Sequence, residues 1–194
     1  LPLIHPLVGG NRIMSTEYRQ QLEAALGIQV ERGRRVTKPP HVGVHLSPYP
    51  LYYASVEKLW NTALDQRLCG GTARYHFAIT TYLAVLGVGE QSSSPCEALE
   101  LEQRCRDAIE LREEAHGTYN PAPAGLLGLV VGLVEARTRL DYLTAGEEYL
   151  HDPVIKETWL DSLVCSVQAE VLYTEGQSLP HGQAGTPAPQ LLGV

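Results

Sequence analysis

The chain has 194 residues, with 15 lysines and arginines against 22 aspartates and glutamates, which gives a formal net charge of −7. Hydrophobic residues make up 44% of the chain, so it can bury a core of its own, and wholesale disorder is disfavoured. The acidic balance argues against a nucleic-acid-binding surface, because such surfaces concentrate Lys and Arg.

The first 50 residues predict one helix followed by a linker. Apolar side chains recur at helical spacing over residues 17–34, and Ser15 or Thr16 can cap this helix. Prolines then favour irregular or extended backbone over residues 36–50. His41 and His45 are four residues apart, but in such a linker this spacing does not indicate a metal site.

From Leu51 onward the pattern is helical. The apolar periodicity predicts a helix over residues 51–68 that ends at Cys69-Gly70-Gly71, and a second over residues 73–86 that is closed by Gly87 and Gly89. The segment Ser94-Pro95-Cys96-Glu97 is a capping box with proline at the first helical position. It predicts a third helix that ends near residue 115.

The last third of the chain predicts three more helices, over residues 124–139, 140–151 and 154–175. The longest apolar run, residues 122–134, is shorter than the roughly 20 residues that a membrane span needs. No segment shows the alternation of a strand. We therefore expect an all-α chain without a membrane span, followed by a loop-like tail rich in proline and glycine over residues 176–194.

Two stretches of the chain repeat a pattern. Ala63-Leu-Asp-Gln-Arg67 with Gly70-Gly-Thr72 parallels Ala108-Ile-Glu-Leu-Arg112 with His116-Gly-Thr118. The offset is 45 positions between the arginines and 46 between the threonines. A period of about 34–47 residues with paired helices is typical of solenoids.

The second unit, with the turn Thr118-Tyr-Asn-Pro121 and the small-residue helix after it, resembles the long tetratricopeptide repeats of kinesin light chains and related adaptors. Asn120 stands where that family usually has His, and the Tyr and Trp positions of the next helix are not clear. The resemblance covers Leu51 to about Leu150. It implies helical hairpins stacked as a short α-solenoid; an irregular helical bundle is the alternative.

In such an array the first helix of each hairpin lines a concave groove. The resemblance therefore implies a partner-binding groove formed by residues 73–86 and 124–139. Its candidate residues are those too polar or too large for the core: Arg74, Tyr75, Thr81, Tyr82, Arg137 and Arg139. In the alternative interpretation, Tyr75 and Tyr82 are core aromatics with exposed hydroxyl groups.

The sequence shows no motif that indicates catalysis, metal binding or phosphate binding. The four cysteines form no CxxC pair, and we interpret them as buried thiols in a reducing, intracellular and cytoplasmic compartment. Glu113-Glu114-Ala115-His116 supplies only one of the two Glu-x-x-His motifs that a di-metal bundle needs. The glycine pairs lack the Lys-Ser/Thr context of a phosphate loop. We expect no catalytic residue, metal or cofactor.

We therefore expect a non-catalytic helical scaffold or adaptor that binds a protein or peptide partner, with three parts: an N-terminal segment (1–50), a helical-hairpin domain (51–175) and a tail (176–194). The first alternative is a structural subunit of a larger assembly, such as a viral particle or an organellar complex. A small helical enzyme is the second alternative.

Overall fold

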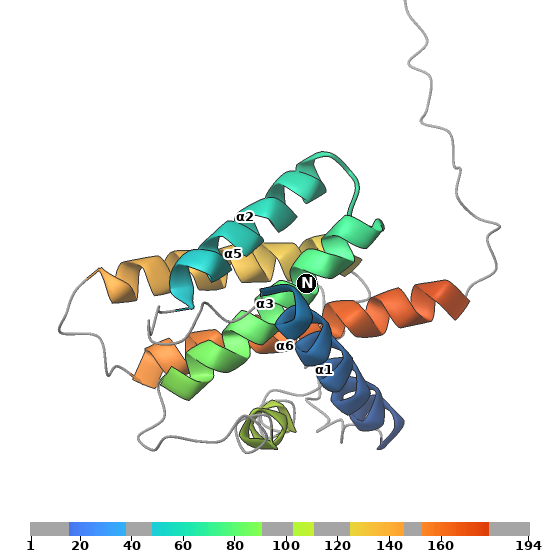
Figure 1. Cartoon of the computed structure of the whole chain (residues 1–194), viewed down its shortest axis with the longest axis horizontal. Coiled ribbons are helices and arrows are strands. Elements are labelled where there is room, and N and C mark those ends of the chain that lie inside the picture. The colour runs from blue at the N-terminus through green and yellow to red at the C-terminus, as the bar shows by residue number, and fades with distance from the viewer. Residues whose placement is uncertain (1–15, 38–47, 91–102, 111–124, 146–152, 179–194) are drawn as a thin grey trace, which may run out of the picture.

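The computed structural model describes residues 16–37, 48–90, 103–110, 125–145 and 153–178. These residues form helices joined by turns and contain no strand, which confirms the all-α prediction. The helices are α1 (Thr16–Thr37), α2 (Tyr49–Leu64), α3 (Gly71–Glu90), α5 (Gly125–Thr144) and α6 (Pro153–Ser178), and residues 103–110 form a further short helix (Figure 1). The capping box, the second repeat unit beyond residue 110 and the tail beyond residue 178 lie outside the described residues.

Helix α2 ends earlier than the sequence predicted. Gln66 adopts a left-handed backbone conformation with φ of 58°. The backbone N–H of Gln66 donates to the Ala63 carbonyl, and that of Arg67 donates to the Thr62 carbonyl. This is the Schellman arrangement that terminates helices. The glycines expected to end α2 lie instead at the start of α3.

Two other predicted boundaries are wrong because tertiary packing continues across them. Helix α3 does not stop at Gly87, which is buried against the ring of Trp159 on α6. Helix α5 does not break at Leu140, because the buried stripe formed by Leu129, Leu133, Ala136, Leu140 and Leu143 keeps helical spacing throughout.

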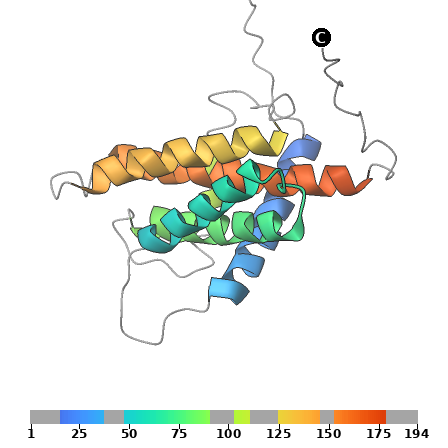
Figure 2. The ribbon, with the colours of Figure 1, turned by 90° about the horizontal axis from the view of Figure 1, so that it is seen from above.

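Helix α6 is the centre of the fold. It packs against α1, α3 and α5, and α2 packs on α3 and α5 (Figure 2). Between Thr158 and Val171 almost every α6 side chain is buried, so this helix carries no solvent face over that stretch. Several of its polar side chains bond within the protein; for example, the Ser162 hydroxyl lies 2.6 Å from the Tyr52 hydroxyl and 3.0 Å from the Thr158 carbonyl.

Helix α1 belongs to the same core as the later helices. Its buried stripe of Leu22, Ala25, Leu26 and Val30 joins the common hydrophobic cluster. Helix α1, which lies within the predicted N-terminal segment 1–50, thus packs on helices of the predicted domain 51–175. Among the described helices, α1 also contacts α6. This packing of helix on helix is compatible with both the bundle and the solenoid interpretation.

None of the helices in the described ranges is both long enough and apolar enough to cross a lipid bilayer.

Candidate functional site

Helices α1, α3 and α6 meet at a carboxylate that two arginines share. Glu170 lies on α6, and its side chain is 1% exposed. Its Oε2 accepts hydrogen bonds from Arg74 Nε at 3.0 Å and from Arg32 Nη1 at 3.2 Å, and its Oε1 accepts one from Arg74 Nη2 at 2.5 Å. Gln29 Nε2 donates a further bond to Oε2 at 3.1 Å. The carboxylate is thus fully paired although it is buried.

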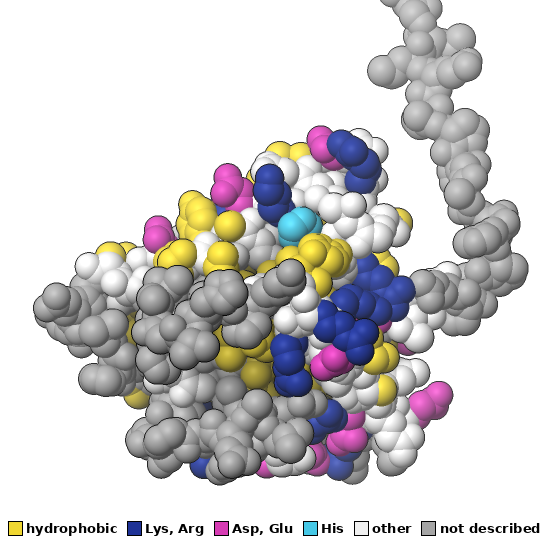
Figure 3. All heavy atoms as spheres, viewed as in Figure 1, with side chains coloured by type: hydrophobic (Ala, Val, Ile, Leu, Met, Phe, Trp, Pro, Cys, Tyr) yellow, Lys and Arg dark blue, Asp and Glu magenta, His cyan; other side chains and the backbone are white. Residues whose placement is uncertain are grey.

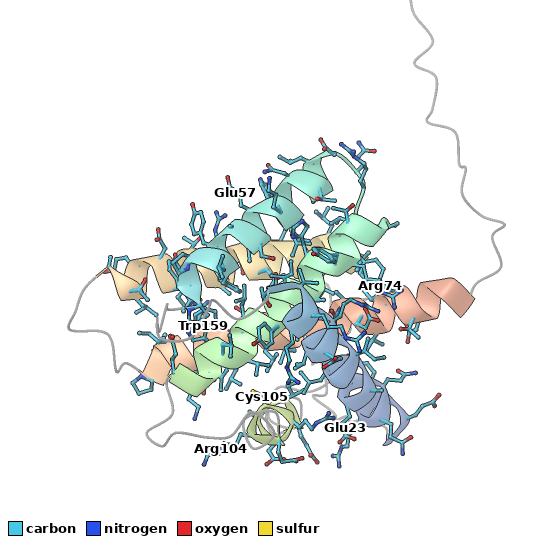
Figure 4. The ribbon with its side chains drawn as sticks, viewed as in Figure 1. Glu23, Glu57, Arg74, Arg104, Cys105 and Trp159 are labelled. Atoms are coloured by element: carbon cyan, nitrogen blue, oxygen red, sulfur yellow. The ribbon has the colours of Figure 1, made fainter. Side chains whose placement is uncertain are left out.

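Each of the three helices contributes two side chains spaced three residues apart. These pairs are Gln29 and Arg32 on α1, Arg74 and Phe77 on α3, and Glu170 and Tyr173 on α6. Residues at this spacing share one helix face, so each helix turns a short polar or aromatic edge toward the junction. Figure 4 shows Arg74 on α3 where that helix passes α6.

Aromatic rings support the Arg74 guanidinium. Its Cζ lies 5.6 Å from the centroid of the Tyr173 ring, a cation–π distance. The Tyr173 hydroxyl donates to the Leu68 carbonyl at 2.5 Å, and its ring packs edge-on against Phe77. The hydrogen bonds to Glu170 raise the pKa of Arg74 above its ordinary value. Burial raises the pKa of the Tyr173 phenol. Arg74 therefore stays charged and Tyr173 stays neutral.

The junction carries more positive than negative charge. Two guanidiniums share the single carboxylate of Glu170, and Arg34 and Arg35 lie 3.6 and 2.8 Å from the exposed carboxylate of Glu31. We call Arg32, Arg34, Arg35 and Arg74 the arginine cluster. Figure 3 shows Lys and Arg side chains gathering where α1 crosses α3 and α6. In a chain of net charge −7, the cluster with its two carboxylates keeps two positive charges.

Both arginines of the buried network also reach the surface. The side chain of Arg32 is 35% exposed and that of Arg74 is 24% exposed. A guanidinium has five N–H donors. Within the described part of the chain, the bonds to Glu170 use two donors of Arg74 and one of Arg32. The bonds to Glu170 thus leave further N–H donors on both of these partly exposed side chains.

The six residues predicted for a binding groove lie at separate places. Arg74 is in the junction, and the neighbouring Tyr75 ring is 41% exposed. Arg137 lies over the ring of Tyr53, with its Cζ 4.4 Å from the ring centroid. Arg139 pairs with Asp161 on α6 at 3.2 Å.

Two of the six are taken up by packing. Thr81 is fully buried and donates its hydroxyl hydrogen to the Phe77 carbonyl, so its predicted exposure to a groove is wrong. Tyr82 is half-buried, and Gly33 of α1 lies against its Cβ. This tyrosine therefore packs partly against α1.

Helix geometry separates the two halves of the predicted groove. Asp161 and Glu170 are nine residues apart on α6, which is about two and a half turns. They therefore face opposite sides of that helix. The arginines that they bind, Arg139 and Arg74, consequently do not line one groove.

Sequence reasoning missed Glu170, Arg32 and Gln29. A signal was present: Glu170 interrupts an apolar stretch and has Ser166 and Thr174, not a cation, four residues away on either side. A carboxylate placed so in a buried helix needs a cation from another helix. The identity of that cation could not be read, because Arg32 and Arg74 are 138 and 96 positions from Glu170.

Metal chemistry finds no support in the described ranges, where no three His, Cys, Asp or Glu side chains come together in a way that could hold an ion. No protein-family profile, curated protein or solved structure matches the chain.

Proposed function

We propose that this chain is a non-catalytic helical scaffold or adaptor that binds a protein or peptide partner at the junction of α1, α3 and α6. We define the junction surface as Arg32, Arg35, Arg74 and Tyr75. The observation that carries the proposal is the sharing of one buried carboxylate by two partly exposed guanidiniums. The resemblance to tetratricopeptide repeats supports a binding role in general but does not select this surface.

Physical chemistry favours this surface as a binding site. Arginine and tyrosine are the residue types most often found at the energetic centres of protein interfaces. Glu170 and Tyr173 already hold Arg74 in place, so a partner loses less side-chain entropy by contacting it than by contacting an unrestrained arginine. The surface combines a fixed charge with an exposed aromatic ring at Tyr75.

A second candidate function is that of a structural subunit in a larger assembly, and a different surface favours it. Tyr49 on α2 bonds to Asp141 on α5, and Tyr53 lies under Arg137, so the two helices run antiparallel. Continuing that register brings Trp60 and Leu64 of α2 alongside the early residues of α5. The exposed apolar residues of these two helices include Trp60, Leu64, Leu127 and Val131. Exposed apolar patches often mark interfaces.

We further propose that the partner is met in a reducing intracellular compartment such as the cytoplasm. Cys69 is an exposed thiol, and no disulfide joins the three described cysteines. Exposed thiols persist where the environment is reducing. The exposure of Cys69 corrects the prediction that every cysteine is buried.

The test is partner capture by the full chain and by matched surface variants. The bait is presented to an extract of cells that express the chain, and circular dichroism confirms that each variant folds. Tyr75→Ala and Arg35→Glu each alter the junction surface, whereas Tyr142→Ala alters a ring on α5 that is 74% exposed. We expect both junction variants to lose about tenfold of the captured partner, as the loss of one interface anchor predicts, and Tyr142→Ala to retain it.

If Trp60→Ala or Leu127→Ala lowers the amount of captured partner and the junction variants do not, the result would instead support the assembly interface. Equal capture by every variant would show that neither surface binds the partner.

A further inference from the structure

We infer that the junction surface binds an acidic peptide segment, whose aspartate or glutamate carboxylates pair with Arg32 and Arg74 on the side opposite Glu170. This inference rests on the proposed function and specifies the chemistry of the partner. It concerns a peptide carboxylate, and other anions are outcomes of the test below.

The arginine donors at the junction are held in a fixed position. Glu170 binds Arg74 through both carboxylate oxygens, at 2.5 and 3.0 Å, in the fork geometry that fixes a guanidinium plane. Arg32 reaches the same Oε2 atom at 3.2 Å. The two guanidiniums therefore meet at one carboxylate, and both side chains are partly exposed, that of Arg32 by 35% and that of Arg74 by 24%. A second carboxylate approaching from outside meets donors that are already in place.

The charge balance at the junction also favours an incoming carboxylate. Two adjacent guanidiniums repel each other, and one carboxylate neutralises only one of them. An incoming carboxylate completes the pairing and makes the four-group arrangement neutral. Because the chain as a whole carries −7, an acidic segment is repelled by much of the surface and attracted at the arginine cluster. That contrast gives the site its specificity.

The small size of the arginine cluster favours a peptide over an extended polyanion. Nucleic acids are bound by long basic surfaces that contact many phosphates, whereas this cluster consists of four arginines next to the acidic residue Glu31. Tyr75 follows Arg74 in the chain and exposes 41% of its surface. An exposed aromatic residue next in sequence to Arg74 suits an acidic segment that also carries an apolar side chain.

The test uses fluorescence anisotropy with the full chain and a short labelled peptide of alternating glutamate and leucine. The matched peptide has glutamine in place of glutamate, and a third peptide carries phosphoserine at the same positions. We expect the glutamate peptide to bind and the glutamine peptide to bind at least about tenfold more weakly, because charged hydrogen bonds contribute about 1.5–3 kcal/mol each. We also expect added salt to weaken binding of the glutamate peptide.

Variants of the chain locate the binding site. Arg32→Gln removes the excess charge over Glu170, and Arg35→Gln removes an exposed neighbour. Lys156→Gln removes the same charge from an exposed position near the start of α6, fourteen residues before Glu170. We expect Arg32→Gln to weaken binding of the glutamate peptide about tenfold and Arg35→Gln to weaken it a few-fold. The affinity of Lys156→Gln should stay within about twofold of the wild-type affinity.

Equal binding of the glutamate and glutamine peptides, or an equal loss in Lys156→Gln, would overturn the inference. Binding of the phosphoserine peptide alone would replace the peptide carboxylate by a phosphate as the ligand. If the partner captured by the full chain depends on Tyr75 but not on salt or on Arg32, the acidic chemistry is wrong while the proposed binding surface remains.

Discussion

At the scale of single residues, Glu170 decides how α1, α3 and α6 fit together. A buried carboxylate costs several kcal/mol to desolvate unless cations and donors surround it. Here Arg74, Arg32 and Gln29 supply four hydrogen bonds from two other helices. The network therefore selects one arrangement of three helices, because any other leaves a charge buried without a partner.

We predict that Glu170→Gln destabilises the fold. The substituted amide turns a donor toward arginine donors and leaves both guanidiniums without a countercharge. Breaking a buried pair costs about 3–5 kcal/mol, and we expect about 2–3 kcal/mol here because Arg32 and Arg74 are partly exposed and regain water. Urea unfolding measures the change in free energy.

The matched control is Glu31→Gln, which removes the exposed pairs with Arg34 and Arg35. Exposed ion pairs contribute about 0–1 kcal/mol, so this variant should unfold close to the wild type. Similar losses in the two variants would show that burial of Glu170 does not matter.

At the scale of elements, the sequence specified the existence of the helices better than their ends. Apolar periodicity located α1, α2, α3 and α6 because each buries a stripe against neighbours. The ends depend on contacts that local pattern does not contain. Gly87 was expected to stop α3, but the ring of Trp159, 72 positions later, occupies the space that a side chain at position 87 would fill. The same limit applies to the candidate site, where Arg74 and Tyr75 were predicted but Glu170 was not.

We predict opposite effects for two glycine-to-alanine substitutions. A Cβ at Gly87 would lie only 2.7 Å from Trp159 Cε3, closer than real contacts allow. Gly87→Ala should therefore cost about 1–3 kcal/mol by overpacking. Gly27→Ala, inside α1, would meet only Arg106 Nη2 at 3.5 Å. Alanine favours helices over glycine by about 1 kcal/mol, so this variant should be slightly stabilised. Thermal unfolding measures the stability of both variants. A Gly87→Ala variant as stable as the wild type would contradict the packing explanation.

The end of α2 offers a stabilising substitution. Gln66 holds the left-handed conformation of the Schellman arrangement, with φ of 58°, which costs a side-chain-bearing residue about 1–2 kcal/mol. Glycine avoids this cost but loses more entropy on folding, about 0.5–1 kcal/mol. Gln66→Gly should therefore gain about 0.5–1 kcal/mol in urea unfolding. Gln66→Ala keeps the strain and is expected to gain nothing; an equal gain in both variants would disprove the backbone explanation.

At the scale of the whole molecule, buried tyrosines make stability depend on alkaline pH. Burial raises the pKa of Tyr52, Tyr173 and Tyr49, and the hydrogen bond to Asp141 adds to the effect at Tyr49. In the unfolded chain a phenol loses its proton near pH 10. Above that pH the unfolded chain binds fewer protons than the folded one, so stability is fully present below pH 10 and falls as pH rises beyond it.

Urea midpoints measured from pH 9 upward test this dependence. Tyr52, which is fully buried, should contribute a loss of about 1.4 kcal/mol per pH unit above pH 10, and Tyr49 and Tyr173 should contribute less because they are less completely buried. Tyr52→Phe should flatten the slope by one such contribution, although it also removes the hydrogen bond to Ser162. Tyr142→Phe, at an exposed position on α5, should keep the wild-type slope. An unchanged slope in Tyr52→Phe would refute the assignment.

The whole molecule also explains why charge gathers at one place. Helix α1 crosses α3 and α6 (Figure 1), and the crossing brings arginines from two helices over one carboxylate of a third. Composition alone showed an acidic chain. The fold adds a local basic surface that the net charge concealed, and this surface is the basis of the proposed function.

The most direct test of that account follows the arginine side chains of the full-length chain by NMR during titration with the glutamate–leucine peptide. We predict that the Nε–H resonances of Arg32 and Arg74 shift with a common saturation curve, while that of Arg139, which pairs with Asp161 on the other side of α6, stays in place. Saturable shifts at Arg139 without shifts at Arg32 and Arg74, or no shift at any arginine, would contradict the account.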